Sequence, residues 1–142
     1  MNSRFSLAIH VLCLLAMQPE ERMTSGFLAM SIGTNPVVIR RLMAKLREAE
    51  LVTSKGAAGG GWMLARPAAK ISLTSVRSAL EDEVAMRMHK EQPHPACPVG
   101  QGVHQALSLV YGQVDTAIDR ALSQVSVADV LADALAKSAV AG

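Results

Sequence analysis

Basic side chains recur at helical spacing in one part of this 142-residue chain. Arg40, Arg41 and Lys45 fall on the side of a predicted helix that lies opposite an apolar stripe, so they are expected to face solvent. Guanidinium groups donate hydrogen bonds to phosphates and to guanine edges, which is the chemistry of a helix in the major groove of DNA. The charges alone do not distinguish this function from an ordinary solvated helix face.

A cysteine in a polar, proline-rich segment is the other residue that could do chemistry. Cys97 directly precedes Pro98, and a residue before a first-turn proline is a plausible N-cap for the helix that follows. Thiols at helix N-termini favour the reactive thiolate form, and His89, Lys90 and His94 are near in sequence. The two hypotheses are a thiol switch that responds to oxidants or electrophiles, and a structural cysteine.

The same segment offers a loose set of possible metal ligands, namely His89, His94, Cys97 and His104. Their spacing matches no strong zinc pattern, so we expect no metal and keep the set as an alternative. A small-molecule effector bound between domains is another alternative. The sequence has no Ser/His/Asp or Cys/His constellation in a strand-to-helix setting and no phosphate loop, so we expect the chain not to be an enzyme.

Two helices are predicted before the basic one. The first runs from Ser3, its expected cap, to about Met17 and is apolar nearly all round. The second is short, begins at Thr24 or Ser25 and ends at Gly33, which can adopt a positive φ. A short helix, a tight turn and a longer helix are the order of a helix-turn-helix. The expected buried positions of the second helix are Phe27, Leu28 and Ile32.

The third helix, from Pro36 to about Glu50, has favourable start signals. Asn35 is a good N-cap, and Pro36 suits the first helical position because its missing N–H needs no partner there. Thr34 and Val37 flank this start. The expected buried stripe consists of Ile39, Leu42, Met43 and Leu46.

A glycine-rich hairpin is predicted directly after the third helix. Residues 51–54 and 62–65 are typical of two short strands joined by a flexible turn. Glycines would let the turn approach a DNA backbone closely, while Lys55 at the base of the hairpin and Arg66 beyond it add positive charge. A hairpin in this place is the wing of a winged helix-turn-helix. The glycines concerned are Gly59, Gly60 and Gly61.

The second half of the chain predicts a short helix within residues 71–83, capped by Ser72 or Thr74, and then a polar loop. A long amphipathic helix follows from about Val99 to Val125. Its apolar stripe is too long for so small a chain to bury, so we expect it to pair with the same helix of a second subunit.

A last helix is expected to begin around Ser126, and the tail, residues 137–142, is expected to fray. The side chains expected to point inward are Val127, Val130, Leu131 and Leu135.

Composition agrees with this plan. Half of the residues are hydrophobic and 3% are aromatic, which excludes general disorder and predicts an aliphatic, mainly helical core. Residues 1–66 carry eight basic and four acidic side chains, whereas residues 67–142 carry six and eight, so a polyanion would bind the first half. The apolar stretch near the N-terminus is too short to span a bilayer and lacks a cleavage signal, so we expect a cytoplasmic protein without membrane contact.

These segments resemble the Rrf2 family of bacterial winged-helix transcription regulators, which includes iron–sulfur-cluster and nitric-oxide-responsive members and a regulator of cysteine metabolism. The resemblance spans nearly the whole chain and rests on residues 31–42, residues 46–52 and the glycine hairpin through Pro67. It implies a homodimer that reads a pseudo-palindromic operator. The DNA-binding residues that it implies are Thr34, Asn35, Pro36, Val37, Arg40, Arg41, Lys45, Gly59, Gly60 and Gly61.

The chain departs from the pattern of the cluster-binding members, which have three cysteines spaced about six residues apart. Cys97 matches the last of these, but Glu91 and Ala85 stand at the two earlier positions. Since iron–sulfur clusters need mostly thiolate ligands, we expect no cluster and no cofactor. The sequence around Cys97 is similar to that of a single-cysteine subgroup of the family.

The predicted fold is mainly α-helical with a small β-hairpin. Its predicted parts are a winged helix-turn-helix domain (1–83), a sensor loop (84–98) and a region with the dimerisation and C-terminal helices (99–142). The expected function is sequence-specific DNA binding by a homodimeric repressor, with Cys97 as its sensor thiol and double-stranded DNA as its partner. The alternative is an interaction module whose C-terminal half binds a metabolic enzyme or a metal or small-molecule effector, with DNA binding secondary.

Overall fold

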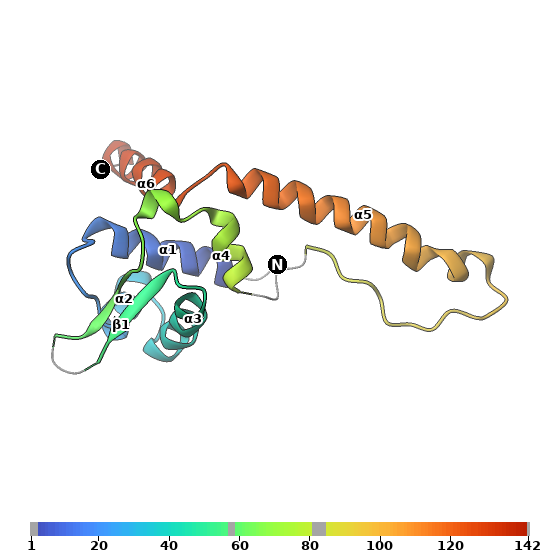
Figure 1. Ribbon diagram of the computed structural model, residues 1–142, viewed down its shortest axis with the longest axis horizontal. Helices are drawn as coiled ribbons and strands as arrows, with labels where there is room; N and C mark the ends of the chain where they lie inside the picture. Colours follow the sequence, from blue (N-terminus) through green and yellow to red (C-terminus); the bar gives the residue numbers. More distant parts are fainter. Residues whose placement is uncertain (1–2, 57–58, 81–84, 142) are drawn as a thin grey trace.

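Three helices and a hairpin make up the first half of the chain in the computed structural model, which describes residues 3–56, 59–80 and 85–141. The helices α1 (Arg4–Met17), α2 (Ser25–Ile32) and α3 (Pro36–Glu48) precede the antiparallel strands β1 (Val52–Lys55) and β2 (Gly61–Leu64). A 3-10 turn, η1 (Ala68–Lys70), then leads to α4 (Leu73–Ala79), the long α5 (Pro98–Ser123) and α6 (Val127–Ala141). This is the mainly helical fold with a small hairpin that the sequence predicts (Figure 1).

The helix-turn-helix forms because its boundary residues satisfy the free backbone groups. The Thr24 hydroxyl accepts a hydrogen bond from Phe27 N at 3.0 Å, and Asn35 Oδ1 accepts one from Val38 N at 3.1 Å. Gly33 ends α2 with a φ of 91°. The predicted caps of α2 and α3 are thus confirmed. Ser3 precedes α1 but makes no capping bond with its side chain, contrary to expectation.

The core gathers around α1, which is buried on one broad side. The predicted stripe of α3 is confirmed in full, since all four of its side chains are buried. Val127 at the start of α6 belongs to the same core, so the C-terminal helix packs back onto α1 (Figure 1). The remaining core side chains include Ala8, Val11, Leu12, Leu15, Leu28, Val52, Ile71, Val76 and Leu80.

Two helices differ from their predicted burial. Phe27 is 45% exposed because the buried side of the short α2 runs through Leu28 and Ala29 instead. Leu135 is 48% exposed because α6 contacts the core only with its first turns. α6 continues through residues 137–141, which the sequence predicts to fray, and residue 142 lies outside the described residues. Of the described helices, none has the length and apolarity to cross a bilayer.

The hairpin register moves Lys55 away from its predicted place. Val52 pairs with Leu64 at the base of the hairpin, and Lys55 pairs with Gly61 beside the turn. The prediction that Lys55 lies at the base is therefore wrong, because β1 begins one residue later than expected and continues through Lys55. The exposed side chain of Lys55 therefore belongs to the end of the hairpin next to the turn.

Gly61 is required by packing inside the domain. Met23 pairs with Trp62 through two backbone hydrogen bonds of 3.0 and 2.8 Å, which adds a bridge beside β2. A Cβ at Gly61 would lie 2.7 Å from Met23 O, and the φ of Gly61 is 130°. Gly59 also has a positive φ, 76°, but a Cβ there would meet nothing within 4 Å. Gly61 is therefore needed both for its positive φ and for the close approach of Met23, whereas Gly59 is needed only for its positive φ.

We predict that Gly61→Ala lowers the free energy of unfolding by about 2–4 kcal/mol, since a steric clash with backbone adds to the conformational cost. Gly59→Ala is the matched control and is expected to cost about 1 kcal/mol. Urea denaturation of both variants measures the difference. Equal stability of the two variants would contradict the role of the Met23 contact.

Candidate nucleic-acid interface

The solvent side of α3 carries the residues that could contact DNA. Arg40 and Arg41 are exposed, Val37 is about half exposed, and Lys45 is partly buried at the edge of the same face. Because the opposite stripe is buried, this face cannot turn inward without unpacking the core. α3 therefore presents a fixed, basic surface with a small apolar side chain near its N-terminus.

The residues at the start of α3 act on the helix itself. The side chain of Asn35 is engaged in the cap, and Pro36 occupies the first helical position. Thr34 is partly buried in the turn, where its backbone N–H donates to Ala29 O at 2.9 Å. These three residues fix where α3 begins. If they lie beside a bound duplex, as predicted, they contribute mainly through the position of their backbone.

The C-terminal end of α3 is tied to the hairpin through Arg47. Its Nη1 donates to Ser54 Oγ at 3.2 Å, and its guanidinium carbon lies 5.7 Å from the centre of the Trp62 ring, a cation–π distance. Trp62 Nε1 in turn donates to Ser25 Oγ on α2 at 3.0 Å. The hairpin is thus attached to both helices of the helix-turn-helix, which fixes its position relative to the basic face of α3.

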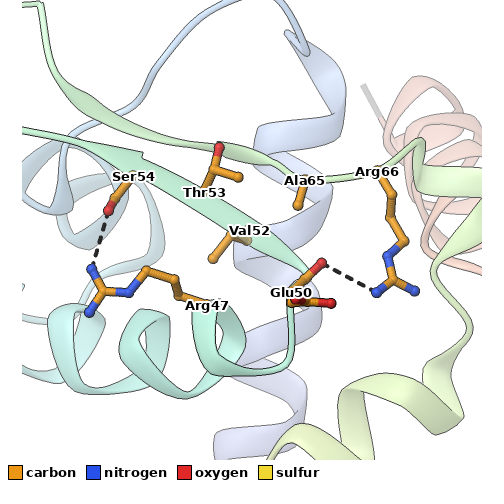
Figure 2. A pocket seen from close by; sticks show the side chains of 7 residues that line it. All are labelled: Arg47, Glu50, Val52, Thr53, Ser54, Ala65 and Arg66. Carbon is orange, nitrogen blue, oxygen red and sulfur yellow. Dashed lines mark hydrogen bonds between the residues drawn. The ribbon is translucent and has the colours of Figure 1, made fainter.

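A shallow hollow lies beside these contacts, between the end of α3 and the hairpin (Figure 2). Arg47 and Arg66 stand at its opposite ends, each with a hydrogen bond: Arg47 to Ser54, and Arg66 Nη2 to Glu50 O at 3.3 Å (Figure 2). The carboxylate of Glu50 lies in the same hollow and offsets part of the positive charge. The two arginine hydrogen bonds hold the hairpin against the end of α3, and the side chains that line the hollow carry both positive and negative charge.

The described part of the wing places Lys55 and Gly59 at the surface, with Gly60 and Gly61 partly buried. The hairpin extends from the domain beside α3 (Figure 1). A duplex that received α3 in its major groove would have the hairpin next to its backbone, which is the geometry of winged-helix proteins.

Cys97 occupies the predicted position at the N-terminus of α5. Its Sγ accepts a hydrogen bond from Gly100 N at 3.3 Å, and Pro98 begins the helix. The preceding loop lies against this first turn, since a Cβ on Gly100 would clash with Cβ of Pro93. The thiol is partly buried between loop and helix, so a change in its chemistry would affect the contact of the two.

The alternative metal set is not assembled. The rings of His89 and His104 meet edge to face, with 4.8 Å between their centres, whereas His94 Nδ1 accepts from Ala96 N. In the part of the chain that the structure describes, no three His, Cys, Asp or Glu side chains gather in a way that could hold a metal ion.

The sequence analysis missed an ion-pair cluster between α4 and α5, in which a buried arginine meets two partly exposed aspartates. The guanidinium of Arg77 lies 2.9 Å from Asp115 Oδ1 and 2.6 Å from Asp119 Oδ1. The hydrogen bond from the backbone N–H of Ala85, and then that from Arg77, hold the pKa of Asp115 below its ordinary value. The available signal was the i,i+4 spacing of the two aspartates on the predicted long helix.

Comparisons with known proteins agree with the geometry. A family model described as "Rrf2: Iron-dependent Transcriptional regulator" matches residues 1–133. YwnA of Bacillus subtilis (strain 168), which its name places among HTH-type transcriptional regulators, is 36% identical over 130 residues, covering 92% of this chain and 96% of YwnA.

Solved structures extend this similarity. One described as a DNA-binding protein is 35% identical with a TM-score of 0.74, and the match covers 91% of this chain and 99% of that one. CymR, described as the global cysteine regulator of B. subtilis, is 18% identical with a TM-score of 0.69, covering 93% of this chain and 95% of CymR. The CymR match shows the fold alone.

The family description mentions iron, but the cysteines of this chain do not fit the ligand set of an iron–sulfur cluster. Cys13 is buried in α1 within the core, and burial raises the pKa of its thiol. Cys97 begins α5 at its far end, away from α1 (Figure 1). One chain therefore offers a single accessible thiol to a group that needs mostly thiolate ligands.

Proposed function

The chain belongs to the Rrf2 family of DNA-binding transcriptional regulators, and on this premise we propose that it is a homodimeric repressor of a pseudo-palindromic operator. In this proposal residues 1–83 bind DNA, residues 84–98 form a sensor loop and residues 99–142 dimerise. The observation that carries the proposal is the exposed basic face of α3 opposite a fully buried stripe.

Each proposed contact follows from side-chain chemistry. Arg40 and Arg41 donate to phosphates or guanine edges, Lys45 contacts a phosphate, and Val37 packs against a thymine methyl group. Lys55 reaches the backbone from the tip of the wing. The remaining proposed residues contribute close backbone approach and the placement of α3: Thr34, Asn35, Pro36, Gly59, Gly60 and Gly61.

The homodimer is supported by the exposure of α5. None of the described side chains of this 26-residue helix is buried within the chain. Leu109 is 73% exposed and Val110 is 48% exposed, and Val99 and Ala106 lie exposed nearby. Pairing with the same helix of a second copy removes this apolar surface from water and places two α3 helices on one duplex.

Chromosomal footprinting followed by a salt titration tests the proposal. Footprinting of the bound chain in cells recovers the operator, and the affinity for that duplex is then measured from about 50 to 300 mM salt. If each subunit neutralises three or four phosphates, the slope of log affinity against log salt is about −5 to −7. A flat salt response would contradict the proposed interface.

We further propose that Cys97 is a sensor thiol. The Cys97 sulfur would attack one oxygen of hydrogen peroxide, the O–O bond would break and water would leave. The resulting sulfenic acid carries an oxygen on the sulfur that accepts the hydrogen bond from Gly100 N, so this contact would change. We predict that peroxide lowers the operator affinity of the wild type about tenfold, whereas Cys97→Ser does not respond. Cys13→Ala is the control and is expected to respond as the wild type. If wild type and Cys97→Ser respond alike, or neither responds, the switch is ruled out.

A further inference from the structure

The C-terminal end of α5 is fixed to the DNA-binding domain by backbone. Leu73 N donates to Val125 O and Val127 N donates to Ile71 O, both at 2.9 Å, so the segment before α4 pairs with the turn that follows α5. A pair of neighbouring hydrogen bonds fixes the position of this end. It does not by itself fix the direction in which the rest of the helix extends.

A second attachment lies further along α5 and consists of side chains. Arg77 on α4 binds Asp115 and Asp119, which stand one turn apart on the same face of α5, at 2.9 and 2.6 Å. Thr74 Oγ1, also on α4, donates to Asp119 O at 2.9 Å. Arg77 is only 9% exposed, and burial lowers the pKa of its guanidinium. The hydrogen bonds to the two aspartates and their negative charges together outweigh burial, so the net effect raises this pKa.

Apolar packing within the chain is too sparse along α5 to fix the direction of this helix without the polar contacts to α4. Every side chain of α5 that the structure describes keeps some exposure, and Leu122, near the C-terminal attachment, is the one that packs against the core cluster. Beyond Asp115 the helix extends away from α4 (Figure 1). Two attachment points define a line, and the ion pair supplies the second of them.

The remaining length of α5 turns a small rotation into a large shift. The helix rises about 26 Å over the 17 residue steps from Pro98 to Asp115, at 1.5 Å per step. A tilt of about 10° moves the far end by about 4–5 Å, which exceeds the roughly 3.4 Å between neighbouring base pairs. In a dimer built through α5, the same tilt changes the separation of the two α3 helices.

We propose that Arg77 is a positioning residue that sets the direction of α5 against the DNA-binding domain and thereby the half-site spacing that the dimer accepts. This inference rests on the proposed function, because it needs a dimer paired through α5 and a two-part operator. Arg77 is not a DNA contact. Its replacement therefore leaves the sequence of each half-site unchanged and alters only the distance between half-sites.

Selection of binding sites from random duplexes separates spacing from base recognition. The wild type is expected to enrich one half-site sequence at one spacing. Arg77→Met keeps an unbranched apolar stem but removes both ion pairs, and is expected to enrich the same half-site at several spacings. The ratio of the best to the next spacing is expected to fall about tenfold. Arg77→Lys, which keeps the charge without the two-pronged geometry, is expected to lie between them.

The matched control is Lys137→Met, which removes the exposed ion pair with Asp133 on α6 and is expected to keep the wild-type spacing. If circular dichroism shows that Arg77→Met does not fold, the double variant Asp115→Asn/Asp119→Asn replaces it, since these carboxylates are 33% and 48% exposed. A variant that folds and still enriches a single spacing overturns the role of Arg77. Failure of the wild type to enrich a two-part site instead overturns the proposed function, and with it this inference.

Discussion

Replacing Arg40 and Arg41 together with alanine is expected to lower operator affinity by at least about 100-fold. Each guanidinium that contacts a base edge contributes about 1–3 kcal/mol, and the substitutions remove four such groups from a dimer. Both side chains are exposed and lie outside the buried stripe of α3. The free energy of unfolding should therefore stay within about 0.5 kcal/mol of the wild-type value. Fluorescence anisotropy on the recovered operator measures the change in affinity.

The control for this double variant is Lys137→Ala, which removes an exposed charge on α6 and should leave affinity unchanged. The salt slope of the double variant should also become shallower, by about one unit for each phosphate that is no longer neutralised. If the double variant binds the operator as tightly as the wild type, α3 is not the reading helix. If it no longer binds DNA but still captures a partner protein through its C-terminal half, the chain also acts as an interaction module.

Val110→Glu is expected to convert the proposed homodimer into monomers. Val110 lies in the middle of the exposed apolar stripe of α5, and a carboxylate placed there would be buried without a partner in both subunits. An uncompensated buried charge costs about 3–5 kcal/mol, so the dissociation constant of the dimer should rise at least about 100-fold. Sedimentation velocity at several concentrations measures this change, and operator affinity should fall with it.

Ser108→Glu introduces the same charge about 160° away from Val110 around the helix and serves as the control. Ser108 is exposed and lies outside the apolar stripe, so this variant should remain dimeric. Monomers of both variants would indicate that helix charge alone disrupts α5. Dimers of both would place the subunit contact on another surface.

Local signals account for the parts of the fold that the sequence predicts. The side chains of Thr24 and Asn35 act on backbone groups three residues away, and Gly33 acts on its own φ. The stripe of α3 repeats every three or four residues, so a helix of any orientation must bury it. The N-cap position of Cys97 follows from its neighbour Pro98 in the same way.

Contacts between distant residues account for what the sequence does not predict. Gly61 is needed because Met23, 38 positions earlier, pairs beside β2, and no local rule indicates that strand contact. Arg77 meets its partners 38 and 42 residues later, on a helix that periodicity describes only as amphipathic. Leu135 has the spacing of a buried residue, but α6 extends past the core that would cover it.

Binding-site selection with the unmodified chain tests the central claim most directly. The chain is incubated with random duplexes of about 40 base pairs, and the bound fraction is sequenced after several rounds. We predict two copies of one half-site in inverted orientation, with centres about one helical turn, roughly 10 base pairs, apart. Enrichment of no sequence, or of a single motif without two-fold symmetry, would contradict a homodimer that reads DNA through α3.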